Sequence, residues 1–191
     1  MFRTVLAAAC AVCATAASAA TLTQTAHFPG ADAGDLFAMY MSTDGHAAIT
    51  GLPARFVNTG GDPVETAGIG DRLAAFCFTP DQCGLDARII DVQKAPGAHT
   101  VVMSWWNFGW VSAVNPDDVA ASPRGALDST LVLTFRDTPT GAQIELVQAN
   151  VPDYKVRIPN PDGSEEIGPL SQIVNTHWNT LYWDRIRGLT E

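Results

Sequence analysis

Histidine and cysteine are the residue types in this sequence that are best suited to chemistry, and there are four of each. The histidines are His27, His46, His99 and His177. None has a sequence neighbour at the spacing of a metal site, so we interpret them as ordinary core or surface residues and expect no metal. His177 has the most interesting neighbours, because a helix through this region would also carry Tyr182 and Asp184. With one of them it could handle protons in a cyclase-like enzyme, although His177 and Asp184 lie two helical turns apart.

The common catalytic motifs are absent from the sequence. There is no His-Glu-x-x-His pair, no Gly-x-Ser-x-Gly elbow and no Gly-x-x-x-x-Gly-Lys loop. The Gly-rich stretch at residues 60–70 lacks a lysine and a following helix pattern, so we predict that it is a connecting loop. We therefore expect a binding protein without a cofactor rather than an enzyme.

The first 20 residues have the pattern of a secretory signal peptide. A short start with Arg3 is followed by an uncharged, Ala-rich run at residues 5–17 and then by small residues up to Ala20. Cleavage is expected after Ala19 or Ala20. A lipoprotein modified at Cys10 is an alternative, but its apolar run would be only a few residues long. The run is also shorter than the roughly 20 residues of a membrane-spanning helix, so we expect a periplasmic or secreted protein with no stable membrane span.

Cleavage would leave residues 21–191, a length that suits one domain with its own core. The whole chain has 11 basic and 20 acidic residues and a formal charge of −9. Loss of Arg3 makes the charge −10. Such a chain repels phosphate backbones, so we expect no nucleic-acid partner.

Cys77 and Cys83 are the cysteines that remain after cleavage. Two thiols in an oxidising compartment usually pair, and a turn-like Pro-Asp sequence separates the two strand-like runs that carry them. We predict a Cys77–Cys83 disulfide across a hairpin. The alternative is a pair of buried free thiols; zinc would need two further ligands nearby.

The elements that must position these residues follow from periodicity. Residues 21–28 read as a strand, while 32–42 and 44–50 read as two short helices, the second ended by Gly51. Alternation then predicts strands that are half-buried. These are residues 72–78, 85–92, 99–108, 131–136 and 142–149.

The chain closes with an amphipathic pattern at residues 170–189, which predicts a long C-terminal helix. Short connections between the strands favour an antiparallel meander, and the fold class is therefore α+β. A helix across a curved sheet leaves a space that either fills with side chains or stays open as a ligand cavity. The aromatic residues that could line such a cavity, or form plain core, are Phe37, Tyr40, Phe135, Trp178 and Tyr182.

Trp105 and Trp106 are adjacent on a predicted strand and therefore point to opposite sides of it. They cannot both lie in the core if one face of that strand is wet. One of them should contact a partner, a ligand or a neighbouring loop.

Five blocks of sequence resemble the homologues of the heat-shock protein ATPase activator C-terminal domain, in the same order and near the same spacing. The blocks are AAITGLPA at 47–54, VVMSW at 101–105, STLVLTF at 129–135, NVP at 150–152 and LYWD at 181–184. The resemblance spans nearly all of the mature chain. That family belongs to the START-like, or SRPBCC, superfamily, so the resemblance implies a helix-grip fold, with a curved antiparallel sheet wrapped around a long C-terminal helix.

The resemblance implies three kinds of function. The first is binding of a small apolar or amphipathic molecule between the sheet and the C-terminal helix. The second is a protein-interaction module related to chaperone ATPase activators, and the third is a cyclase-like enzyme. Fold alone cannot choose among them. The signal peptide argues against a cytosolic chaperone as partner, because an exported protein meets neither that chaperone nor ATP.

Overall fold

The computed structural model describes residues 19–79, 82–106, 129–152, 155–159 and 164–191. The predicted signal peptide, apart from its last two residues, lies outside these ranges, as does the segment 107–128. The side chain of Trp106 also lies outside the part that can be described, so the prediction about Trp105 and Trp106 stays a prediction.

The fold is built on an antiparallel, curved sheet of eight strands. Strands β4 to β8 form the predicted meander, β1 adds to its edge beside β8, and β2 and β3 extend the opposite edge. In sheet order the strands are β1 (Ala19–Pro29), β8 (Gly141–Pro152), β7 (Ser129–Thr138), β6 (Ala98–Trp106), β5 (Gln82–Ala95), β4 (Arg72–Thr79), β2 (Arg55–Val57) and β3 (Pro63–Val64). A separate pair consists of β9 (Lys155–Pro159) and β10 (Glu165–Pro169).

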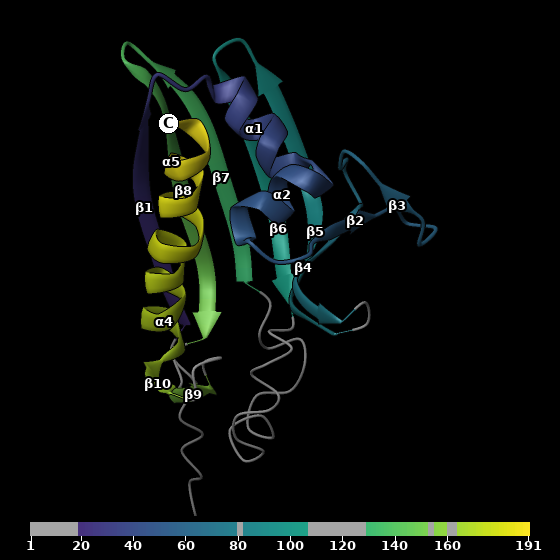
Figure 1. Cartoon of the computed structure of the whole chain (residues 1–191), viewed down its shortest axis with the longest axis vertical. Coiled ribbons are helices and arrows are strands. Elements are labelled where there is room, and N and C mark those ends of the chain that lie inside the picture. Colours follow the sequence, from purple (N-terminus) through teal and green to yellow (C-terminus); the bar gives the residue numbers. More distant parts are fainter. Residues whose placement is uncertain (1–18, 80–81, 107–128, 153–154, 160–163) are drawn as a thin grey trace, which may run out of the picture.

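The helices all lie against one face of this sheet (Figure 1), which we call the inner face. Strand β7 shows how the sequence makes the two faces different. Leu131, Leu133 and Phe135 point inward and are buried, whereas Thr130 and Thr134 alternate with them toward the outer face. The period-two pattern in the sequence therefore predicted the inner face correctly.

Helices α1 (Ala33–Met41) and α2 (Thr43–Thr50) begin and end within one residue of the predicted bounds. The Asp32 side chain caps α1 by accepting hydrogen bonds from the backbone N–H groups of Gly34 and Asp35, at 2.7 and 3.1 Å. Gly51 ends α2 in the left-handed conformation, with φ of 66°. On the inner face, α1 packs against β6, β7 and β8, whereas α2 packs against β2 and β4.

The C-terminal helix is continuous but contains a π-helical turn that the sequence did not reveal. It consists of α4 (Leu170–His177), η2 (Trp178–Trp183) and α5 (Asp184–Thr190). Because hydrogen bonds in a π-helix join residues five apart, Trp178 and Trp183 come to the same side of the helix, together with Tyr182. All three are buried against the sheet.

The predicted fold class is confirmed: a curved antiparallel sheet holds a long C-terminal helix against its inner face, in an α+β arrangement. Strands β2, β3, β9 and β10 were not predicted. Strand β3 lies within the Gly-rich stretch that was predicted to be only a loop. Among the described residues, none of the helices is long and apolar enough to cross a membrane.

Candidate functional site

The five aromatic residues predicted to face a cavity meet on the inner face. Phe37 and Tyr40 come from α1, Phe135 from β7, and Trp178 and Tyr182 from η2. The ring centroids of Phe135 lie 5.6 Å from Phe37 and 5.8 Å from Tyr40. Tyr182 joins the two groups, at 6.4 Å from Tyr40 and 4.4 Å from Trp178. We call these five residues the aromatic cluster.

The aromatic cluster is closely packed. Each of its members has at most 5% of its surface exposed. In this conformation these side chains fill the space where they lie, as the core alternative expects. Their role as a ligand site stays a prediction.

His46 lies at the side of the aromatic cluster, against Tyr40 and Tyr182, although its sequence context had suggested nothing beyond an ordinary residue. It comes from α2 and is completely buried. Its Nδ1 lies 3.0 Å from the backbone carbonyl oxygen of Tyr40, and its Nε2 lies 3.5 Å from the hydroxyl of Tyr182. The rings of Tyr40 and Phe56 pack edge-to-face on it.

Burial determines the protonation of this group. Desolvation lowers the pKa of His46 from 6.5 to about 4, and the hydrogen bond to the Tyr40 carbonyl opposes this only in part. The imidazole is therefore neutral near pH 7. Since a carbonyl only accepts, Nδ1 carries the proton and donates it to Tyr40, which leaves Nε2 as the acceptor for the Tyr182 hydroxyl.

The tyrosines beside His46 are poor acids for the same reason. Desolvation raises the pKa of Tyr182 and of Tyr40 above the usual 10. His46 is thus a weak base, Tyr40 and Tyr182 are weak acids, and all three are shielded from water. In the packed state this group therefore has little capacity for proton transfer. Its evident effect is structural, because it links α1, α2 and η2 through polar atoms.

Tyr182 and Asp184, the two residues considered as proton-handling partners of His177, lie in different environments. The hydroxyl of Tyr182 lies beside His46, on the buried side of the helix. Asp184 is exposed and accepts a hydrogen bond from Arg187 at 2.7 Å. Among the described residues, no group of three or more His, Cys, Asp or Glu is placed to hold a metal ion.

Two glutamines hold the terminal helix to the sheet, and sequence reasoning missed both. The indole N–H of Trp178 donates to Gln148 Oε1 at 2.9 Å, and Gln148 Nε2 in turn donates to Ser129 Oγ at 2.9 Å. The indole N–H of Trp183 donates to Gln24 Oε1 at 2.5 Å. Gln24 Nε2 then donates to the Oδ1 of Asn175, at 2.7 Å.

A signal for Gln148 was present in the sequence. It follows Ile144 and Leu146 at the inward positions of β8, where an apolar residue is expected. A polar residue at such a position needs a buried partner. The partner could not be identified, because Trp178 lies 30 residues further along the chain.

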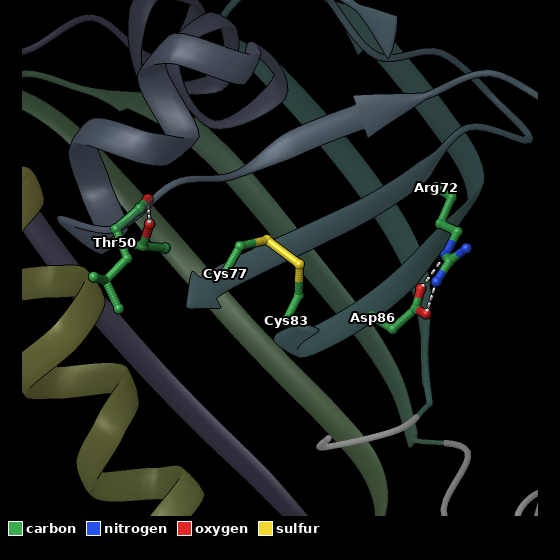
Figure 2. The surroundings of a disulfide bond; sticks show 6 residues. Thr50, Arg72, Cys77, Cys83 and Asp86 are labelled. Carbon is green, nitrogen blue, oxygen red and sulfur yellow. Dashed lines mark hydrogen bonds and ion pairs between the residues drawn. A yellow bond between two sulfur atoms is a disulfide. The ribbon is translucent and has the colours of Figure 1, made fainter. Parts of the chain in front are cut away.

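The predicted disulfide is present: Cys77 on β4 and Cys83 on β5 face each other and are bonded, with an S–S distance of 2.07 Å (Figure 2). The backbone N–H of Cys77 also donates to the carbonyl of Pro53 at 3.0 Å. This bond ties the end of β4 to the segment after α2, where the Thr50 hydroxyl donates to the carbonyl of Leu52 at 3.0 Å.

Phe76, which precedes the disulfide, has a left-handed backbone with φ of 55°. For a bulky residue this conformation is strained and persists only when its surroundings fix it. Phe76 is half-buried, and its ring packs edge-to-face on Tyr182 at 6.1 Å. The disulfide corner thus reaches the aromatic cluster through Phe76.

Comparison with solved structures supports this architecture. The chain is similar to a protein from Chromobacterium violaceum, with 14% identity, a TM-score of 0.54, and coverage of 90% of this chain and 96% of that one. It is also similar to an HSP90 activator from Plasmodium falciparum, with 13% identity, a TM-score of 0.52, and coverage of 90% and 94%. A protein from Mycobacterium smegmatis has 18% identity, a TM-score of 0.51 and 90% coverage of each chain.

No model of a known protein family matches the chain, and no curated protein matches it. Identities this low establish a shared fold over most of the chain and do not transfer a function. One of the proteins that share this fold is named as an HSP90 activator. This agrees with the fold that the sequence resemblance implies.

Proposed function

We propose that this chain is an exported protein-interaction module, whose mature domain binds another exported protein through its outer surface. The observation that carries the proposal is the packing of the aromatic cluster. Its five side chains pack together and have at most 5% exposure, so in this conformation they offer little surface to a small molecule. Recognition of a partner would then take place at the outer surface of the protein.

The fold is compatible with such a role, since a protein named as an HSP90 activator shares it. The predicted signal peptide moves the partner to the periplasm or the outside of the cell, away from any cytosolic chaperone. We therefore carry over the general mode, binding to another protein, and not the identity of the partner.

A small apolar or amphipathic ligand remains the second candidate, and one observation favours it. His46 Nε2 and the Tyr182 hydroxyl form a polar pair 3.5 Å apart inside an apolar interior. A polar pair among aromatic residues is the usual composition of a ligand site. Such a ligand would require the C-terminal helix to move away from α1 and α2.

Cross-linking in the cells that make the protein tests the first proposal. The full chain carries a C-terminal affinity tag and is treated with a cross-linker that does not enter the cytoplasm. We expect mature protein that begins at Ala20 or Thr21, joined to a protein partner. The matched control lacks residues 2–20, stays inside the cell and should yield no such product. Exported protein that forms no cross-linked species in repeated preparations contradicts the proposal.

A further inference from the structure

The two edges of the eight-stranded sheet end in different ways. One edge is β3, which has 2 residues, the first of them Pro63. The other edge is β1, which has 11 residues and none of the charged types Asp, Glu, Lys and Arg. Its only proline is the last residue, Pro29. Proteins usually protect an exposed edge by shortness, proline or charge. Because most of β1 has none of these, it is suited to pair with a further strand.

The direction of the backbone groups along β1 follows from its pairing with β8. The N–H of Gly30 donates to the carbonyl of Thr140 at 2.9 Å, and these two residues continue the register in which Pro29 is opposite Gly141. Hydrogen-bonded pairs alternate with non-hydrogen-bonded pairs in an antiparallel ladder. The even-numbered residues at 22–28 therefore bond to β8. The odd-numbered residues between them direct their N–H and C=O groups away from the sheet.

These outward groups lie at the surface of the molecule. In the part of the chain that the structure describes, no strand pairs with β1 on the side away from β8, and β1 forms the border of the sheet in Figure 1. Thr23, Thr25 and His27 are exposed. Pro29 continues the same series without an N–H and so ends it. We call residues 23–27 of β1 the open edge.

A hollow lies beside the open edge on the outer face of the sheet. It is lined by residues 23–25 of β1 and 145–147 of β8, and its volume of about 320 Å³ is open to solvent. Thr25 is opposite Glu145 in the strand register. A strand added to the open edge would lie two strand spacings, about 10 Å, from β8. Since threonine is short, a long side chain of that strand can pass over Thr25 toward Glu145.

The hollow combines an apolar wall with an acidic one. Val147 is 41% exposed. The Glu145 side chain is 44% exposed, accepts a hydrogen bond from Gln143 at 2.8 Å and lies 4.0 Å from the guanidinium of Arg136. An exposed ion pair at that distance is weak, so the carboxylate can still attract another cation. Lysine and arginine match this hollow, because each has an apolar stem and a charged end.

We propose that the partner adds an extended segment to the open edge of β1 and places a lysine or arginine of that segment in the hollow. This inference rests on the proposed function, since it states where and how the partner binds. Charge favours such an occupant, because the chain has a formal charge of −9 and attracts a basic segment. A second copy is a poorer fit: its own β1 has no lysine or arginine for the hollow, and it brings a like charge.

Site-specific photo-crosslinking tests this placement in the full, exported chain. A photo-reactive amino acid replaces His27, at the end of the open edge, in one variant and Thr130 in the other. Thr130 is also exposed, but it lies on β7, between β6 and β8 and away from both edges. We expect cross-links to a partner protein from position 27 and little from position 130. The cross-linked peptide, identified by mass spectrometry, should contain a lysine or arginine.

Further changes in the position 27 variant separate the edge from the hollow. Thr25→Pro removes an N–H that the ladder with β8 does not use, and it should lower the yield about tenfold by the loss of a backbone hydrogen bond to the partner. Glu145→Gln should lower the yield about fivefold, the effect of one exposed ion pair. Glu65→Gln, an exposed carboxylate next to β3, should leave it unchanged. Circular dichroism shows whether each variant is folded, and if Thr25→Pro is not, the glutamine pair decides.

The possible failures are distinguishable. Protein cross-links from position 130 but not from position 27, or a yield that folded Thr25→Pro does not lower, overturn this inference and leave the proposed function intact. Equal losses with both glutamine variants overturn the placement of a basic side chain in the hollow. A cross-linked product of two copies of this chain overturns the choice of another protein as the occupant. Absence of protein cross-links from both positions, and from the chemical cross-linker, removes the proposed function itself.

Discussion

The two faces of strand β5 differ sharply in exposure, although neighbouring residues of one strand form both. On the inner face, Ala87 and Ile89 have at most 1% exposure and pack beneath the helices. On the outer face, Arg88 and Ile90 alternate with them and are exposed. A change of one position along a strand moves a side chain from the core to the solvent. The same short segment therefore contributes to stability through one set of residues and leaves the other set at the surface, where the proposed function places recognition.

The largest effect is expected from breaking the inner face at Trp178. Trp178→Ala removes the ring contacts with Trp105, Tyr182 and Trp183 and leaves Gln148 without its donor. Large aromatic-to-alanine changes in a core cost about 3–5 kcal/mol. Urea denaturation should show this loss, while Val147→Ala on the outer face should change stability by less than about 0.5 kcal/mol. Similar small losses for both would contradict a packed inner face.

Acid should weaken the inner face through His46. Because its folded-state pKa is lowered from 6.5 to about 4, the unfolded chain binds a proton in this interval that the folded protein excludes. The contribution is complete above pH 6.5 and is lost as the pH falls to about 4, which amounts to about 3 kcal/mol.

Urea denaturation at pH 7 and pH 4 measures this loss. His46→Asn should lose less stability between the two pH values than the unaltered protein, by most of that amount. His27→Asn, on the exposed side of β1, serves as the control and should lose as much as the unaltered protein. An equal pH dependence in all three would show that His46 is not held neutral by burial.

The polar contacts of β8 offer a matched comparison of the two faces on one strand. Gln148→Leu leaves the Trp178 indole and the Ser129 hydroxyl without their buried partner, at a cost of about 2 kcal/mol. Gln143→Leu, on the outer face, removes only a partly buried contact with Glu145 and should cost far less. Thermal denaturation of both variants compares them directly, and an equal cost would mean that the Gln148 contacts contribute little.

Replacing both cysteines tests the corner that connects the faces. Cys77 and Cys83 are six residues apart, and closing so short a loop in the unfolded chain accounts for about 2 kcal/mol. The double variant Cys77→Ser/Cys83→Ser should lose about this much in urea denaturation. Because the disulfide lies next to Phe76, hydrogen exchange should also increase in β4. A stability unchanged by the double substitution would contradict this role.

The smallest effect concerns the left-handed backbone of Phe76. Phe76→Ala and Phe76→Gly both remove the ring contact with Tyr182, but only glycine adopts a φ of 55° without strain. The glycine variant should therefore be the more stable of the two by about 1 kcal/mol, the reverse of the usual order in a strand. Differential scanning calorimetry would resolve this difference. An alanine variant more stable than the glycine variant would show that the strain is absent.

Much of the fold was predictable because its signals are local. Asp32 and Gly51 delimit two helices by their own chemistry, and the alternation along β7 separates the faces of the sheet without knowledge of its neighbours. The disulfide was predictable because only six residues and one turn separate its cysteines.

The candidate site was less predictable because its partners are distant in sequence. His46 and Tyr182 are 136 residues apart, and Trp183 and Gln24 are 159 residues apart. A histidine or glutamine in isolation does not reveal which buried donor it will meet. The π turn also depends on packing, since it satisfies the sheet contacts of Trp178 and Trp183 together. The five aromatic residues named from the sequence lie together on the inner face, whereas the polar atoms that fix them were missed.

Native mass spectrometry of the protein purified from the cells that export it tests the central claim most directly, because that claim is that side chains fill the inner face. We expect the mass of the mature chain alone, two hydrogens lighter than the reduced chain and without a bound small molecule. An apolar or amphipathic molecule retained at one copy per chain, and lost in Phe135→Trp, would contradict the claim and place a ligand in the aromatic cluster.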